Sequence, residues 1–191
     1  MAKTLIYILA ISSILAASCS KDDESVLRIN SFVLTTKYGV DNGEFGFDPS
    51  DQWLSTDNEN IEGFGILAEQ QNETAITNSG ISNETNLRIR AYPNPVVDHL
   101  NLRLYPKSET YFDMIILDEK RKITHKSSLK VKSDTTLNLD FRDFSSGDKF
   151  KVIYSLSNEN TLNFVKGYGN IAYCPDLNDS YELEELTRCL H

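Results

Sequence analysis

The chain has 191 residues, of which 40% are hydrophobic, and its 28 acidic and 19 basic side chains give a formal net charge of −9. This composition is sufficient for one packed core, whereas such an excess of negative charge repels nucleic acids and anionic lipids. The basic residues are scattered apart from Lys120-Arg121-Lys122, which follows two acidic residues, so we expect no nucleic-acid partner.

Residues 1–18 have the features of a signal peptide. Lys3 provides the positive charge, residues 5–15 are mostly apolar, and Ala16, Ala17 and Ser18 are the small residues that precede a cleavage site. The apolar run is about half of the roughly 20 residues that a membrane-spanning helix needs. Removal of this segment takes away Lys3 and no acid, which changes the net charge from −9 to −10.

The segment Ala16-Ala17-Ser18-Cys19 resembles the bacterial lipobox, although Ala16 stands where that motif usually has Leu. The resemblance implies that cleavage precedes Cys19 and that the Cys19 thiol carries a lipid. Several acyl chains hold a protein on a membrane almost irreversibly. The alternative is an ordinary signal peptide that ends beside an unrelated cysteine.

Ser20-Lys21-Asp22-Asp23-Glu24 resembles the acidic export signal of surface lipoproteins in the Bacteroidetes. The resemblance assigns Lys21, Asp22 and Asp23 to export and residues 19–26 to a lipidated tether on the outer face of the outer membrane. The alternative is a solvated charge run that leaves the protein on the periplasmic face.

Residues 27–85 are expected to form a strand followed by an irregular region. Leu27, Ile29 and Val33, together with the apolar residues between them, indicate a strand directly after the tether. Residues 38–60 are rich in Gly, Asp, Asn and Glu, which is typical of loops. Apolar residues within 62–69 indicate a second short strand, and residues 70–85 are polar again.

The loop at 38–60 combines aromatic and acidic residues. The aromatic faces could stack against a sugar or a protein ligand, and Trp53 is the candidate contact; the alternative is that these rings pack across the end of a sheet. The aromatic residues are Tyr38, Phe45, Phe47 and Trp53. The oxygen-bearing residues suit a calcium site only in composition, because their spacing matches no EF-hand loop. They are Asp41, Asn42, Glu44, Asp48, Asp51 and Asp57. A solvated acidic loop is the favoured interpretation, and no metal is predicted.

From residue 86 to residue 173, apolar residues alternate with polar ones over several short segments. This period of two predicts half-buried antiparallel strands, and turn residues separate them. Short strands at this spacing favour an all-β, immunoglobulin-like β-sandwich, in which each of two sheets buries one face. The alternating residues are Leu87 and Ile89; Leu100, Leu102 and Leu104; Leu129 and Val131; Leu137, Leu139 and Phe141; and Phe150, Val152, Tyr154 and Leu156.

The same region resembles the C-terminal sorting domain of the type IX secretion system. Tyr92-Pro93-Asn94-Pro95 corresponds to the turn that opens the sandwich in that family, and similar patterns recur near residues 115–122 and 139–152, although the usual Gly is absent from the first. The resemblance implies an immunoglobulin-like module. Two departures weaken the secretion role that it also implies: the chain carries its own lipidation motif, and about twenty residues follow Asn170.

Residues 174–191 are expected to form a helical tail. Leu183, Leu186 and Leu190 recur at helical spacing, and Ser180 is the candidate N-cap, with Glu182 near the positive end of the helix. With Cys19 assigned to the lipid, Cys174 and Cys189 remain as a pair in an oxidising compartment, which predicts a disulfide between them.

Catalytic motifs are absent from the sequence: there is no Gly-x-Ser-x-Gly, His-Glu-x-x-His or glycine-rich phosphate loop. His99 and His125 occupy polar positions of predicted strands and are interpreted as exposed sheet residues. The sequence therefore favours a non-catalytic binding or adhesion protein without a cofactor, whose partners are the outer membrane and a glycan or protein ligand. The alternatives are a secretion module recognised by the type IX apparatus and an enzyme that uses Asp98, His99 or His125.

Overall fold

The computed structural model describes residues 26–46, 53, 55–56, 61–70, 88–158, 161–178 and 181–191. The predictions for the signal peptide, for the lipidated Cys19 and for the export residues Lys21, Asp22 and Asp23 fall outside these ranges. In the described part of the chain, no helix is both long and apolar enough to cross a membrane.

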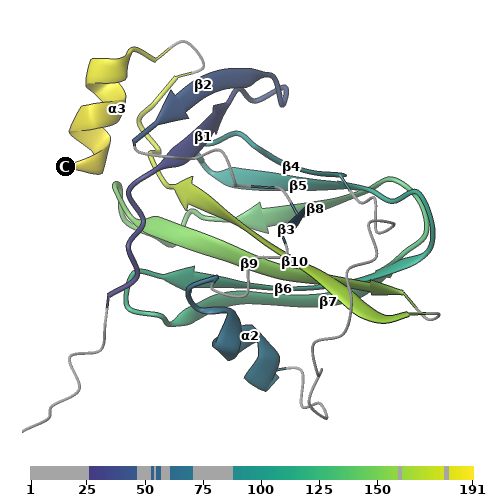
Figure 1. The fold of residues 1–191 in the computed structure, drawn as a ribbon. Helices are drawn as coiled ribbons and strands as arrows, with labels where there is room; N and C mark the ends of the chain where they lie inside the picture. Colours follow the sequence, from purple (N-terminus) through teal and green to yellow (C-terminus); the bar gives the residue numbers. More distant parts are fainter. Residues whose placement is uncertain are drawn as a thin grey trace, which may run out of the picture.

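Two antiparallel sheets pack face to face and form an all-β sandwich (Figure 1). The larger sheet has the order β3 (Ser55–Thr56), β10 (Thr161–Ala172), β9 (Lys149–Asn158), β6 (Thr110–Asp118) and β7 (Ile123–Val131). The smaller sheet has the order β4 (Arg88–Tyr92), β5 (His99–Tyr105) and β8 (Thr135–Asp140). From β4 onward, this is the strand order of an immunoglobulin-like fold with an added edge strand beside its third strand, so the predicted fold class is confirmed.

The core between the sheets follows from the alternation in the sequence. In β5, Leu100, Leu102 and Leu104 are fully buried, while the residues between them are only partly buried. Phe112 and Tyr154 face them from the larger sheet, with ring centroids 6.0 Å apart. Burying this apolar surface is the main favourable contribution to folding.

A second core lies on the opposite face of the larger sheet. Ile115, Leu117 and Ile153 point away from the sandwich interior into this second core, and helices and the N-terminal segment cover them. The covering elements are residues 27–34, α2 (Phe64–Gln70) and α3 (Leu183–Leu190). In Figure 1 the purple N-terminal segment runs across this sheet before it enters β1 (Phe32–Thr35). The larger sheet is therefore covered on both faces.

Four predicted elements differ from the structure. Within the predicted loop at 38–60, residues 41–45 form the strand β2 (Asp41–Phe45), which pairs antiparallel with β1. The segment expected to be a strand at 62–69 is instead a turn that leads into the helix α2, and this helix packs its apolar side on the sheet. The predicted first strand begins only at Phe32, although Leu27 and Ile29 are buried as expected. The N-cap of α3 is Glu182 and not Ser180, which falls outside the described residues; Glu182 forms a capping box with Glu185.

The turn between β6 and β7 contains a non-glycine residue in a left-handed conformation. Arg121 adopts a positive φ of 63°, a conformation that costs a side-chain-bearing residue free energy. Its guanidinium contacts Glu62 at 3.2 Å, and Lys122 donates its backbone N–H to the Asp118 carboxylate at 2.8 Å. These contacts help to hold the turn.

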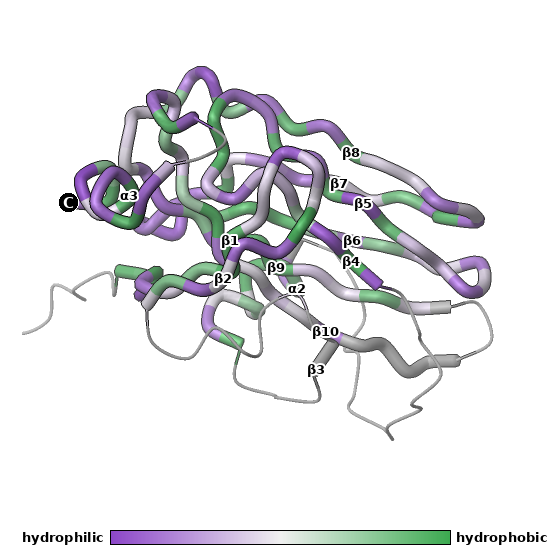
Figure 2. The backbone as a smooth tube through the Cα atoms, turned by 90° about the horizontal axis from the view of Figure 1, so that it is seen from above, coloured by the Kyte–Doolittle hydropathy of each residue, from purple (hydrophilic) through white to green (hydrophobic). Residues whose placement is uncertain are grey.

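Helix α3 is amphipathic and closes one end of the molecule (Figures 1 and 2). Leu186 and Leu190 are buried, whereas Leu183 is exposed. Cys189, in the last turn of the helix, is bonded to Cys174, and the two Cα atoms are 6.0 Å apart. The predicted disulfide is thus confirmed, and it fixes the tail to the end of β10.

Candidate functional site

Asn94, the third residue of the Tyr92-Pro93-Asn94-Pro95 motif, is fully buried where three chain segments meet. Its Nδ2 donates to the carbonyl oxygens of Val33 at 2.8 Å and Asn170 at 2.9 Å, and its Oδ1 accepts from the N–H of Ala172 at 3.2 Å. Its main chain also pairs with Thr35 in both directions, at 2.8 and 3.1 Å. The motif therefore joins β1, the entry to β5 and the end of β10.

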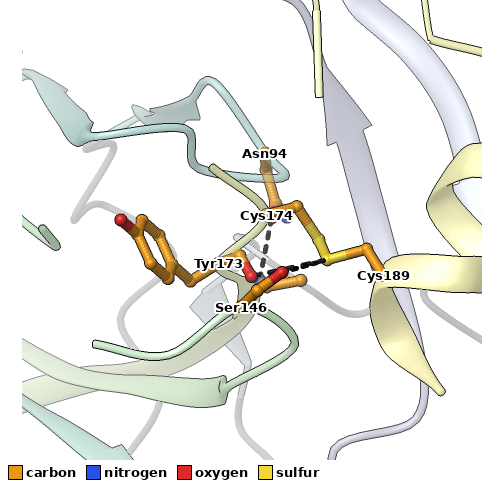
Figure 3. Close-up of a disulfide and its surroundings, with 6 residues drawn as sticks. Asn94, Ser146, Tyr173, Cys174 and Cys189 are labelled. Atoms are coloured by element: carbon orange, nitrogen blue, oxygen red, sulfur yellow. Dashed lines mark hydrogen bonds between the residues drawn. A yellow bond between two sulfur atoms is a disulfide. The ribbon is translucent and has the colours of Figure 1, made fainter. Parts of the chain in front are cut away.

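The next residues extend this junction toward the disulfide. Val96 pairs in parallel with Tyr173, and hydrogen bonds of 2.7 and 2.8 Å join it to Ala172 and Cys174. Figure 3 shows the disulfide with Asn94 and Tyr173 beside Cys174, and with Ser146 beside Cys189. Hydrogen bonds thus join residues 94–96 to residues 172–174 in one unit, and the prolines on either side of Asn94 restrict the backbone there.

A groove with a volume of about 440 Å³ opens above this unit. It lies between the turn after β1, the start of β5 and the chain that leads from Cys174 into α3, three segments on the same side of the molecule (Figure 1). Its apolar lining is Pro93, Pro95, Val97, Leu177 and Tyr181; its polar lining is Thr35, Thr36, Lys37, Asp98, His99, Asn101 and Asn178. This volume lies within the range of about 300–1,000 Å³ that is usual for small-molecule sites.

His99 lies in the polar wall of the groove, next to two acidic side chains. Its Nδ1 lies 3.5 Å from Asp98 Oδ2 and its Nε2 3.9 Å from Asp140 Oδ2. Arg142 binds Asp140 and, mainly through its side-chain hydrogen bonds, holds the pKa of that carboxyl far below its usual range. Two carboxylates therefore flank the imidazole.

The hydroxyl groups of the two threonines in the lining are already engaged. Thr35 Oγ1 donates to the Ala91 carbonyl at 2.9 Å, and Thr36 Oγ1 accepts from the N–H of Val40 at 3.2 Å. Neither contact is with His99, so the described lining contains no nucleophile held by a base in the manner of a hydrolase. Within the described ranges, no three His, Cys, Asp or Glu side chains come together as metal ligands.

Tyr181 forms the wall opposite the motif. Burial raises the pKa of its phenol, and the nearby Asn42 opposes this shift. Because the disulfide closes a loop with a sequence separation of 15 residues around Leu177, Asn178 and Tyr181, this wall is held by a covalent bond.

Trp53, the predicted ligand contact, lies elsewhere. Its indole is partly buried against the sandwich core and lies so close to Gly169 that an added Cβ there would be 2.2 Å from the ring. Its backbone N–H donates to the Tyr168 carbonyl at 2.7 Å. This is the position of a packing residue, the alternative that the sequence left open, and it removes the main support for Trp53 as a stacking platform.

His125 also differs from expectation. It is half-buried rather than exposed, because its ring stacks on Phe141 with centroids 5.6 Å apart and an interplanar angle of 18°. Burial lowers the pKa of its imidazole, and the Asp140 carboxylate opposes that shift. His125 does not line the groove, so the two central histidines do not form one site.

A second polar cluster surrounds the buried Lys151 on the other face of the larger sheet. Its Nζ lies 3.8 Å from Glu62 and 5.2 Å from the centroid of the Tyr168 ring. Burial lowers the pKa of Lys151, and Glu62 opposes the shift. Because Glu62 also binds Arg121, this cluster fastens the start of α2 to the sheet.

Comparison of the chain with protein-family models, with curated proteins and with solved structures finds no match. The resemblance to sorting domains therefore rests on the motif residues, and function has to be argued from the groove itself.

Proposed function

We propose that the protein is a lipid-anchored binding protein of the outer-membrane surface, and that the groove above Asn94 is its ligand site. The observation that supports this is the construction of the groove. Three segments distant in the sequence form its walls, and a buried asparagine and a disulfide hold them. A rigid site of this kind binds without first ordering its own residues, which reduces the entropic cost of association.

Two features favour binding over the alternatives. The described lining offers no activated nucleophile, which argues against an enzyme that uses Asp98 or His99. Asn94, the centre of the sorting-like motif, is fully buried and occupied by internal hydrogen bonds, which argues against its recognition by an export apparatus. A binding protein accounts for both features.

The groove is tested with two matched substitutions on mature protein that carries Cys19→Ala for solubility. Asn101 lines the groove, whereas Thr136 on the neighbouring strand β8 is exposed and is not part of the lining. Asn101→Arg places a long side chain in the groove, whereas Thr136→Arg adds the same charge outside it. Binding is measured on an oligosaccharide array and on a random-peptide library.

We expect ligands that bind the wild type and Thr136→Arg alike but bind Asn101→Arg at least about tenfold more weakly, a loss of about 1.4 kcal/mol. The proposal fails if neither panel contains a ligand, or if every ligand found binds Asn101→Arg as well as the wild type.

Anchoring is tested separately. Cys19→Ala should move the protein from the detergent-soluble membrane fraction to the soluble fraction, because no acyl chains would hold it. Replacing Lys21, Asp22 and Asp23 with Ala should keep the lipid but abolish cleavage by protease added to intact cells. Membrane retention of Cys19→Ala would contradict the anchor, and unchanged protease sensitivity of the triple variant would contradict the export signal.

A further inference from the structure

The turn after β1 carries an exposed aromatic ring beside the groove. Tyr38 is 78% exposed and Val40 60% exposed, and Lys37 between Thr36 and Tyr38 lines the groove. The Lys37 ammonium lies 5.2 Å from the centroid of the Tyr38 ring, which is otherwise open to solvent. A tyrosine that is this exposed gains little from packing within the protein.

The backbone that presents Tyr38 is nevertheless fixed. Arg90 Nη1 donates to the Gly39 carbonyl at 3.2 Å, and Thr36 donates its N–H to the Val40 carbonyl at 2.9 Å. Gly39 has a φ of 73° and rests on the ring of Tyr92, which an added Cβ would approach to 3.2 Å. The backbone that carries Tyr38 is therefore fixed directly after Lys37, which lines the groove.

The groove offers two kinds of surface at once. Pro93, Pro95 and Val97 are apolar, whereas Asp98 and Asn101 carry planar polar groups. The Asn101 Oδ1 already accepts from Asn138, so its Nδ2 is the group oriented to donate, and the exposed Asp98 carboxylate accepts. A sugar ring presents the complement: hydroxyl groups that donate and accept, and an apolar face of C–H groups.

Other ligand classes fit less well. An anionic ligand would meet Asp98 and Asp140 beside His99, and Lys37 is the single Lys or Arg in the described lining. An extended peptide that adds a strand needs an open sheet edge, but β5 is paired with β4 on one side and β8 on the other. The groove floor therefore has no free strand edge.

We propose that the groove binds a neutral oligosaccharide, with the Tyr38 ring stacking on a sugar at the lip and Asp98 and Asn101 hydrogen-bonding to a second sugar inside. This inference specifies the ligand class of the proposed function and rests on it. A ligand that spans from lip to floor needs more than one sugar ring, so affinity should rise from monosaccharides to short oligosaccharides.

The test uses mature protein with Cys19→Ala on an array of neutral and acidic oligosaccharides, followed by titration of the best neutral oligosaccharide. Tyr38→Ala should weaken binding about tenfold, and Tyr38→Phe should retain it because the ring stays. Tyr105→Ala is the matched control: it removes a tyrosine from the far end of β5, about 20 Å from His99 at about 3.4 Å per residue, and should leave affinity unchanged.

The outcomes separate the two proposals. Groove-dependent binding of peptides or of acidic sugars, without binding of neutral ones, would overturn the oligosaccharide assignment and leave the binding function standing. The absence of any ligand sensitive to Asn101→Arg would overturn both. A neutral ligand that binds Tyr38→Ala as well as the wild type would overturn the stacking role of Tyr38.

Discussion

Replacing Asn94 with alanine should lower the free energy of unfolding by about 3–4 kcal/mol. The substitution removes three side-chain hydrogen bonds and leaves the carbonyls of Val33 and Asn170 and the N–H of Ala172 without these partners in a buried site. Each lost bond costs about 1 kcal/mol or more, and a buried group left unpaired costs further. Urea denaturation followed by circular dichroism gives the value.

Asn138→Ala is the control for this prediction. Its amide donates one hydrogen bond, to Asn101, on the exposed surface of the smaller sheet, so its loss should cost less than about 1 kcal/mol. If Asn94→Ala were no less stable than Asn138→Ala, the description of Asn94 as the residue that joins β1 to the sandwich would be wrong.

The double variant Cys174→Ser/Cys189→Ser should lose about 3 kcal/mol, the value expected for a cross-link that closes a loop of about 15 residues. It should also bind the groove ligand more weakly, because Leu177, Asn178 and Tyr181 lie inside the loop that the disulfide closes. Denaturation without reductant gives the stability, and titration with the ligand gives the affinity.

Reduction of the wild type supplies the internal control. Dithiothreitol should bring the wild type to the stability of the double variant and should leave the double variant unchanged. Equal stability of oxidised wild type and double variant would mean that the helix and its buried Leu186 and Leu190 hold the tail without the covalent bond.

The strands of the sandwich were predictable because one physical rule dominates them. Leu100, Leu102 and Leu104 alternate with polar residues, and a strand that faces a core on one side and solvent on the other requires this pattern. The disulfide was predictable for a different reason, since two cysteines remained once Cys19 had been assigned. The helix Phe64–Gln70 was not predictable. In so short a segment, its few apolar residues fit the helical period of about 3.6 residues as well as the strand period of two.

The second core could also have been inferred from the sequence, but from uninterrupted apolar runs rather than from alternation of apolar and polar residues. Residues 114–117 and 150–156 are buried without interruption, and such runs are typical of strands covered on both faces. Met114-Ile115-Ile116-Leu117 could therefore have indicated that something covers the outer face of the larger sheet. What covers it, namely residues 27–34 and the two helices, follows only from the tertiary structure.

The site was only partly accessible to sequence reasoning. Tyr92-Pro93-Asn94-Pro95 was singled out by its resemblance to a family, but nothing local indicates that Asn94 binds Val33 and Asn170. The sequence analysis chose Trp53 rather than Tyr38 as the ligand contact, and only the structure shows that Trp53 is packed against the core whereas Tyr38 is exposed. The groove combines segments near residues 36, 98 and 178, so its existence depends on the packing of the whole chain.

The junction at Asn94 also constrains the order in which the chain can fold. Ser31 and Asn170, which share a hydrogen bond, are 139 residues apart, and Val33 and Asn94 are 61 apart. A chain that crosses a membrane N-terminus first would release Leu27 and Phe32 long before their neighbours arrive. Contacts between such distant residues form slowly, because a large loop must close first. The sandwich would then assemble first, and the segment that emerged earliest would be the last to dock.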